Sequence, residues 1–410
     1  MNSQRVTVVD LGSSKTACLV AESDEQGALR VLASAVVPSK GLQKGAIVDI
    51  EEAVRGVDAA VREVQNSTGE DIQGVFVSVG GRGVEGVNAR GYVPIYPSSR
   101  QITREDVLQV IKHSRQVSLP PDREQIQAMP CSFTIDGEKG ITRPIGRTGA
   151  KLEVVTFLVT GEASHIQNVE RAVSLTGRRV DQMVLQSLAS GLGVLRPEEL
   201  DAGAAVVDLG GGTTDVAVFR GGAIAFCATL PAGGQLVTSD LSKLLKTSPE
   251  EAERLKTEFA AATPEGVADS DTVPVLQLGQ AQPRPLARRV LCEIVQSRMR
   301  EIATMARQQI EKSGWSGELP GGLIVTGGGS LLTGTVAVFE EAMPGVRVRL
   351  GRPSDSGIKM RGADDPALAT AIGLARFALQ SCDDEFVPIG GADDWKDRIR
   401  TFWSLLSGRA

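Results

Sequence analysis

The sequence predicts an α/β fold built from two related halves, and two similar segments carry this prediction. Residues 6–20 and 205–219 each contain a β-branched apolar run, an Asp, glycine and hydroxyl residues, and a second apolar run. Each segment is expected to form two strands joined by a tight turn, because glycine supplies the backbone angles that such turns need. The copies lie about 200 residues apart in a chain of 410, which favours duplicated halves over an array of short repeats.

The other elements of the first half follow from apolar spacing. Apolar residues recur at intervals of three and four between 50 and 68, which predicts an amphipathic helix there. A strand is expected over 75–79, where four of five residues are apolar, and Gly80-Gly81 closes it.

Residues 80–159 predict a small inserted α+β subdomain, because short apolar runs alternate with polar loops. Its strands are expected over 91–96, 127–135 and 154–159, and its loops at 120–121 and 140–149. A helix is expected over 104–116, since Thr103 is a favourable residue to cap its first turn.

The remaining elements complete the two halves. Helices are expected over 164–176, 187–195, 250–259, 286–312 and 366–378, a strand over 323–326, and a loop over 263–271. The first half then comprises residues 1–79 and 160–200. The second half comprises 201–230 and 321–380, with a smaller subdomain at 231–320 and a linker at 381–393.

Composition excludes several function classes. The net charge of −6 disfavours a nucleic-acid binder, because phosphate binding needs a concentrated basic surface. Five scattered cysteines without a C-x-x-C pair argue against a zinc ribbon or a disulfide scaffold. No signal peptide and no apolar stretch of about 20 residues is present, so a cytoplasmic chain is expected.

The two glycine turns have the chemistry of a phosphate site. The first turn offers Asp10 beside Gly12, Ser13, Ser14 and Lys15, and the second turn offers Asp208 beside Gly210, Gly211, Gly212, Thr213 and Thr214. Backbone N–H groups in such turns can hold phosphates, and the two carboxylates can hold Mg²⁺ through water. A third turn, Gly327, Gly328 and Gly329, follows a buried strand and would let adenine approach the backbone. We therefore expect ATP and Mg²⁺ between the halves.

The alternative is that each turn is only a glycine hairpin of a β protein. That explanation suits either turn alone, but a pair of turns with a third glycine run makes it improbable. The chain contains no G-x-x-x-x-G-K-[ST] sequence, which argues against a P-loop protein. No G-x-G-x-x-G follows the first strand, so a Rossmann domain is not supported either.

These segments resemble the phosphate 1, phosphate 2 and adenosine motifs of the actin-like ATPase superfamily, at residues 10–15, 208–215 and 326–329. The resemblance is closest to the bacterial cell-division family FtsA, whose D-I-G-T-S-K and D-I-G-G-G-T-T-D nearly match the first two segments. Similar runs occur at 90–91, 120–124, 233–234, 238–240 and 250–256. The resemblance implies duplicated actin-like (ribonuclease H-like) halves around an ATP cleft and an FtsA-type insert at 80–159.

The resemblance also implies roles for individual residues. Asp10 and Asp208 would organise Mg²⁺ and water, and the glycines, hydroxyls and Lys15 of the two turns would hold phosphates. Gly234, Glu253 and Lys256 would lie at the nucleotide, with the last two contacting ribose. From the residues alone, Glu253 and Lys256 would be a solvated helical ion pair.

Gln186 stands where relatives often carry the Glu or Gln that orients the attacking water, and we take Gln186 and Asp208 as the catalytic pair. Glutamine can orient water but cannot accept its proton at neutral pH. We therefore expect hydrolysis to be slow.

The C-terminal segment predicts an amphipathic helix over 394–407. Its apolar residues fall on one helical face: Trp395, Ile399, Phe402, Trp403 and Leu406. Lys396, Arg398 and Arg400 occupy other positions, as in a helix lying on a membrane surface. A helix docked on the protein's own core, or one that binds a partner, would show the same pattern. Members of the family end in a membrane-targeting helix, which favours the membrane.

The resemblance implies an actin-like scaffold that self-assembles and tethers the FtsZ division polymer to the inner face of the cytoplasmic membrane. Expected partners are the FtsZ C-terminal peptide, contacted within 231–320, further copies of the chain, membrane lipids and later division proteins, without nucleic acid. Two alternatives share the superfold. One is a PilM-like pilus-assembly ATPase, and the other is a small-molecule kinase.

Overall fold

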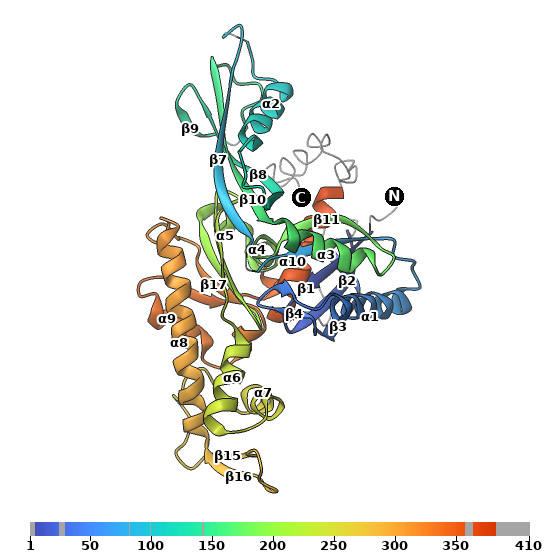
Figure 1. The fold of residues 1–410 in the computed structure, drawn as a ribbon. Coiled ribbons are helices and arrows are strands. Elements are labelled where there is room, and N and C mark those ends of the chain that lie inside the picture. Colours follow the sequence, from blue (N-terminus) through green and yellow to red (C-terminus); the bar gives the residue numbers. More distant parts are fainter. Residues whose placement is uncertain are drawn as a thin grey trace.

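The protein is described by a computed structural model covering residues 5–23, 29–81, 83–98, 100–141, 143–356 and 364–382. Two sheets with their helices form its centre, one subdomain projects from one side, and a mainly helical region projects from the other (Figure 1). No helix in these ranges is long and apolar enough to cross a membrane.

The first half contains a five-stranded sheet in the order β11-β6-β1-β2-β3. Its strands are β1 (Arg5–Leu11), β2 (Lys15–Ser23), β3 (Leu29–Pro38), β6 (Gly74–Val79) and β11 (Arg179–Leu185). β1 and β2 pair antiparallel, and β6 pairs parallel with both β1 and β11. The predicted hairpin and the strand over 75–79 are confirmed.

Helix α1 (Ile50–Thr68) covers one face of this sheet and has the predicted bounds. The Asp49 carboxylate accepts a hydrogen bond from the Glu52 N–H at its start, and Gly69 ends it in the left-handed conformation. Its buried face packs against apolar residues of β1, β2 and β6. Before it runs a short hairpin of β4 (Leu42–Gln43) and β5 (Ala46–Ile47).

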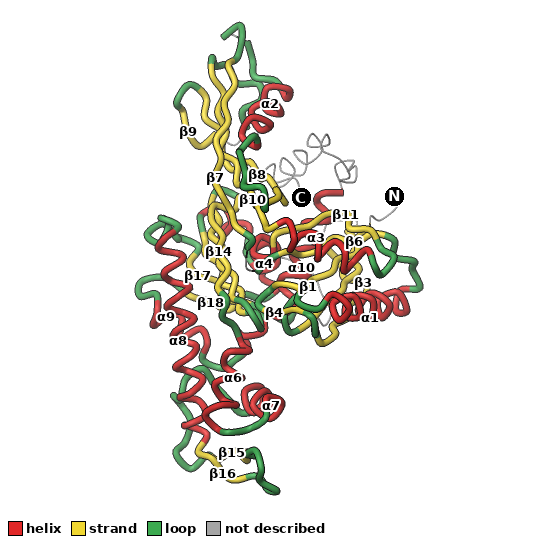
Figure 2. The backbone as a smooth tube through the Cα atoms, viewed as in Figure 1, coloured by secondary structure: helices red, strands yellow, loops and turns green. Residues whose placement is uncertain are grey.

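The insert is a four-stranded antiparallel sheet in the order β7-β10-β8-β9, with one helix on it (Figure 2). Its elements are β7 (Glu85–Pro94), α2 (Arg104–Arg115), β8 (Arg123–Ile135), β9 (Glu138–Ile141) and β10 (Lys151–Glu162). β7 and β10 start before their predicted bounds. β7 has an exposed polar face, so its sequence lacks a continuous apolar run, and the expected loop at 140–149 includes the end of β9.

The second half repeats the strand arrangement of the first. Its sheet has the order β14-β13-β12-β17-β18, formed by β12 (Ala204–Leu209), β13 (Thr214–Arg220), β14 (Ala223–Leu230), β17 (Gly322–Thr326) and β18 (Val348–Leu350). β12 and β13 pair antiparallel while β12 and β17 pair parallel, as β1 does with β2 and β6. This correspondence confirms the prediction of duplicated halves.

The helical region beyond the second sheet consists of α6 (Gly234–Leu245), α7 (Pro249–Glu258), β15 (Thr272–Val275), β16 (Arg284–Ala287) and α8 (Arg288–Lys312). Helix α9 (Thr335–Ala342) lies between β17 and β18 in the chain and packs beside the sheet. The prediction that α8 begins at Leu286 is wrong, because Leu286 pairs with Val273 in the β15–β16 hairpin. The loop predicted over 263–271 contains no helix or strand.

Helices α4 (Gln186–Val194) and α10 (Ala369–Cys382) lie between the two sheets and join them in one apolar core. Their backbones touch, since a Cβ on Gly373 would lie 1.7 Å from the Ala189 carbonyl oxygen. The other helices of the described ranges are α3 (Ala163–Ser174) and α5 (Pro197–Ala202), and short 3₁₀ turns lie there at η1 (Gly328–Leu331), η2 (Pro353–Ser356) and η3 (Pro366–Leu368).

The helix predicted over 366–378 starts as η3 and continues in α10 to Cys382, two residues into the expected linker. The rest of that linker lies outside the described residues. So does the expected tail helix with Trp395, Ile399, Phe402, Trp403 and Leu406.

Candidate nucleotide site

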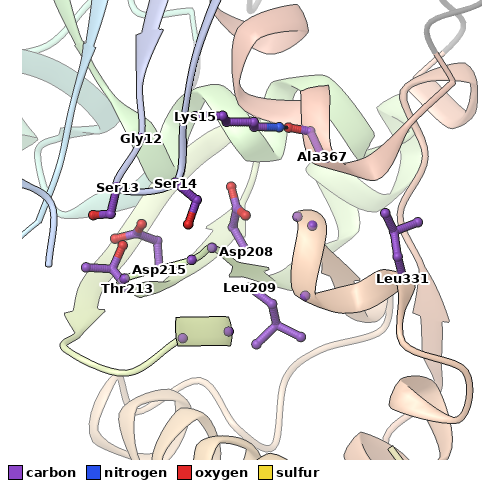
Figure 3. Close-up of a pocket in the computed structure, with 18 of the residues that line it drawn as sticks. Gly12, Ser13, Ser14, Lys15, Asp208, Leu209, Thr213, Asp215, Leu331 and Ala367 are labelled. Carbon is purple, nitrogen blue, oxygen red and sulfur yellow. Dashed lines mark hydrogen bonds between the residues drawn. The ribbon is translucent and has the colours of Figure 1, made fainter. Parts of the chain in front are cut away.

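A pocket of about 380 Å³ lies between the halves and is lined by all three predicted glycine turns. The first turn connects β1 to β2, and the second connects β12 to β13. In Figure 3, Ser13, Ser14 and Thr213 lie with Asp208 and Asp215 at one end, and Leu331 lies at the other. The pocket therefore has a polar end formed by both halves and an apolar end.

The first and second turns approach each other so closely that Gly211 and Gly212 leave no room for a side chain. A Cβ on Gly211 would lie 1.7 Å from Ser14 Oγ, and one on Gly212 would lie 2.6 Å from Ser13 Oγ. Gln235 bridges the turns, because its side-chain Nε2 donates to the Ser13 carbonyl at 3.2 Å and its backbone N–H donates to the Gly211 carbonyl at 2.8 Å.

Three carboxylates meet at the polar end. Asp10 is 5% exposed, and its carboxylate accepts a hydrogen bond from Ser78 Oγ at 2.6 Å. Burial raises the pKa of Asp10, and the charge of Asp208 raises it further, whereas Ser78 and Lys15 lower it. Burial raises the pKa of Asp215 to about 7, against the hydrogen bond from Thr229, and the charges of Asp208 and Asp10 add to the rise. The negative charges of the three carboxylates therefore repel one another at this end of the pocket.

Asp208 is held by groups from the central helices. Its carboxylate accepts from Thr370 Oγ1 of α10 at 2.9 Å and from Ser190 Oγ of α4. Among the described residues, no group of three His, Cys, Asp or Glu side chains could hold a metal ion by itself. A bound cation would therefore take its other ligands from water or a ligand's oxygens.

Two predicted site residues have structural partners. Gln186 begins α4, and its Nε2 donates to the Leu11 carbonyl at 3.1 Å and to Ser78 Oγ at 3.3 Å. The Lys15 ammonium donates to the Ala367 carbonyl (Figure 3). Both line the pocket, so each joins the pocket wall to a neighbouring element.

Thr214, which the sequence placed at the phosphates, does not line the pocket. It is fully buried, and its hydroxyl donates to the Ala232 carbonyl at 2.7 Å. Successive side chains in β13 point to opposite faces, so Asp215 lines the pocket and Thr214 does not.

Gly234, Glu253 and Lys256 line the pocket from α6 and α7. The Lys256 ammonium donates to Thr238 Oγ1 at 2.9 Å and to Glu253 Oε2 at 2.7 Å. The Lys256 side chain is 12% exposed, whereas that of Glu253 is 50% exposed. The ion pair is therefore only partly solvated. Through its bond to Thr238, Lys256 also joins α7 to α6.

The third turn packs against the second-half sheet. Gly327 has a φ of +82°, and a Cβ there would lie 2.2 Å from Asp208 Oδ1. Gly329 lies against Leu209, whereas the only atom near a Cβ on Gly328 is the Ala367 Cβ at 3.8 Å. Gly327 is thus required by packing, and Gly328 leaves open space in the pocket.

The sequence did not single out the apolar end of the pocket. It is lined by Leu209, Met299, Ile302, Leu331 and Leu332. Met299 and Ile302 are three residues apart on α8, a spacing that is equally expected for core residues. Asp215, Ser190 and Thr370 were also missed, and only Asp215 lay within a recognised motif.

Comparison with known proteins gives consistent results. A family model described as cell division protein FtsA matches residues 205–373, and one described as the SHS2 domain inserted in FtsA matches residues 81–160. Cell division protein FtsA of Pseudomonas aeruginosa is 34% identical over 382 residues, covering 92% of this chain and 89% of that one. That of Escherichia coli K12 is 30% identical over 383 residues, with coverages of 92% and 90%.

Solved structures share the fold at lower identity. The PilM–PilN type IV pilus biogenesis complex aligns with a TM-score of 0.64 at 15% identity, covering 91% of this chain and 98% of that one. MreB5 of Spiroplasma citri bound to ADP aligns with a TM-score of 0.56 at 13% identity, covering 91% and 96%. These likenesses confirm the duplicated actin-like fold.

Proposed function

The chain belongs to the FtsA family of bacterial cell-division proteins, and from this membership we propose that its pocket binds ATP with Mg²⁺. The proposal rests on the close approach of the first and second turns at the pocket, where a Cβ on Gly211 or Gly212 would clash with the first turn. Phosphates would lie between these turns, with the base toward the apolar end. MreB5, which has a similar fold, is bound to ADP, and this supports the proposal that the chain binds a nucleotide.

The carboxylates at the polar end fit a magnesium ion. They provide hard oxygen donors, which Mg²⁺ prefers, and their mutual repulsion favours a cation. Asp10 and Asp208 would hold the ion, with Asp215 close to them. When bound, Mg²⁺ would neutralise phosphate charge. Ser13, Ser14, Thr213 and the backbone of Gly211 and Gly212 would hold the phosphates.

We propose that hydrolysis is slow. The Gln186 amide nitrogen is already engaged by Leu11 and Ser78, so holding an attacking water competes with these bonds. A neutral amide also cannot take the water's proton. The pocket would then serve mainly to sense whether ATP is bound.

The binding proposal is tested with the Asp208→Asn variant, which keeps the size of the side chain and removes its charge. Titration calorimetry with Mg-ATP should show no measurable binding. Asp201→Asn is a matched control, because Asp201 is exposed on α5 and does not line the pocket. Unchanged affinity in Asp208→Asn would refute the assignment of the site.

We further propose that the protein polymerises, binds the FtsZ C-terminal peptide through the region 231–320, and recruits later division proteins at the inner face of the cytoplasmic membrane. Family membership supports this role over the pilus-assembly and kinase alternatives, because the likeness to PilM extends only to the fold. A pulldown with the FtsZ C-terminal peptide tests it, and failure to capture the full chain would contradict the FtsZ contact.

Membrane attachment through residues 394–407 is part of the same proposal. Burying the five large apolar side chains of this segment contributes ~8–15 kcal/mol. Ordering about thirteen residues costs ~1–2 kcal/mol each. The ordering cost therefore equals or exceeds the gain, so one tail should bind lipid weakly. Many tails on one polymer should bind strongly, because attachment of the first raises the effective concentration of the others.

A further inference from the structure

The β4–β5 hairpin lies against the nucleotide pocket, although no motif drew attention to it. Its two-residue turn is Lys44-Gly45, with φ values of +49° and +79°, the signs of a type I′ hairpin turn. Hydrogen bonds at the base hold the hairpin in place, from the Ser39 N–H to the Ser14 carbonyl at 3.0 Å and from the Val48 N–H to the Gly41 carbonyl at 2.8 Å.

The tip of the hairpin contacts both phosphate turns. The Gly45 N–H donates to Ser13 Oγ of the first turn at 2.9 Å. On the side of the second turn, a Cβ on Gly212 would lie 3.1 Å from the Lys44 nitrogen, and one on Gly45 would lie 3.5 Å from Thr213 Cγ2. The tip is thus hydrogen-bonded to the first turn and lies close to the second, so a displacement of the first turn acts directly on it.

The same tip contacts the point where the chain enters the insert. Gly81 has a φ of +87° and lies between β6 and β7. A Cβ on Gly45 would lie 2.5 Å from Gly81 Cα, and a Cβ on Gly81 would lie 2.8 Å from the Gly45 backbone. The contact is backbone against backbone, so no flexible side chain can absorb a shift.

We infer that Gly45 and Gly81 are positioning residues that couple the phosphate turns to the orientation of the insert. The inference rests on the proposed binding of ATP at these turns. A phosphate between Ser13 and Thr213 sets the position of both turns, the hairpin tip follows, and Gly81 moves with it. The insert projects from the centre of the molecule (Figure 1), so a small displacement at Gly81 becomes a larger one at its far end.

The test uses Gly45→Ala and Gly81→Ala, with Gly137→Ala as the matched control. Gly137 also has a positive φ, +92°, but no atom lies within 4 Å of its Cβ position. The control therefore introduces similar backbone strain without a clash. Hydrogen exchange is followed in the insert peptide 83–98 and in both turns, with and without Mg-ATP, alongside calorimetric affinity.

We expect the ATP-dependent change in exchange at 83–98 to fall at least about threefold in Gly45→Ala and Gly81→Ala, while the Kd for ATP changes less than about threefold. Without nucleotide, both variants should speed exchange in the first and second turns. Gly137→Ala should do neither. Lys44→Gly should behave like the unaltered chain, because the contacts of the tip are made by the backbone.

Unchanged exchange of the turns in nucleotide-free Gly81→Ala would overturn the inference. Equal effects of Gly137→Ala, or loss of the insert's response in Lys44→Gly, would also overturn it. Failure of the unaltered chain to bind Mg-ATP would refute the proposed function instead, and the nucleotide-free comparison would still decide whether the contact transmits displacement.

Discussion

The contact between Gly211 and Ser14 gives a quantitative test of how the two halves meet. In Gly211→Ala the new Cβ would lie 1.7 Å from Ser14 Oγ and 2.7 Å from Ser14 Cβ. Rotating the serine hydroxyl away removes only the first clash. The second is still about 1 Å short of ordinary carbon–carbon contact, so the turns must separate.

Removing the serine side chain should restore the fit. After Ser14→Gly, the nearest remaining atom of residue 14 to the alanine Cβ would be the backbone nitrogen at 3.6 Å, an ordinary contact distance. We expect Gly211→Ala alone to lower the free energy of unfolding by about 1–3 kcal/mol, as overpacking does. Added to Ser14→Gly, the same substitution should cost much less, giving a coupling energy of at least about 1 kcal/mol.

The assay is a double-mutant cycle by urea unfolding, with ATP affinity measured on the same four proteins. Gly211→Ala should weaken Mg-ATP binding at least about tenfold, or about 1.4 kcal/mol, because the phosphate turns no longer face each other correctly. Gly317→Ala serves as a control, since no atom lies within 4 Å of its Cβ position. Additive effects on stability would refute the claimed contact between the halves.

Three further outcomes are expected. Arg100 holds the pKa of Asp106 at about 2, below its ordinary 3.8. Asp106→Asn should therefore lower the free energy of unfolding by about 1–2 kcal/mol at pH 7. In urea unfolding this difference should shrink between pH 4 and 2, where Asp106 loses its charge. Thr214→Val should lower the unfolding free energy by about 1–2 kcal/mol but leave the Kd for ATP unchanged, whereas Thr213→Val should weaken binding in calorimetry. Ending the chain at Asp393 should abolish sedimentation with liposomes while ATP binding persists, and equal sedimentation would contradict the proposed membrane segment.

Elements with strong local signals were predicted closely. The bounds of α1 matched, because its apolar spacing, its Asp49 cap and its terminal Gly69 all agree. The ends of β7 and the start of α8 differed from the predicted bounds, because pairing between strands determines where these elements begin and end. Val273 and Leu286 pair across a hairpin whose two strands are separated by a loop, and no local pattern records that pairing.

The polar end of the pocket could be predicted because its residues adjoin glycine turns with a recognisable order. The apolar end could not, since Met299 and Leu331 come from segments without a motif and meet only through packing. The support of Asp208 by Ser190 and Thr370 was likewise hidden, because the two hydroxyls lie on helices 18 and 162 residues away and belong to no motif. Thr214 shows the opposite case, because it belongs to the motif but strand alternation turns its side chain away from the pocket.

The charges around the pocket suggest why nucleotide binding should control the relation between the halves. Asp10 belongs to the first half, and Asp208 and Asp215 belong to the second. Burial raises the pKa of Asp10 and of Asp215, and the charges of the three carboxylates repel one another. A cation shared between Asp10 and Asp208 would turn this repulsion into attraction across the pocket. With the slow turnover proposed from Gln186, we expect this attraction to persist, so that bound ATP would act as a lasting signal for assembly.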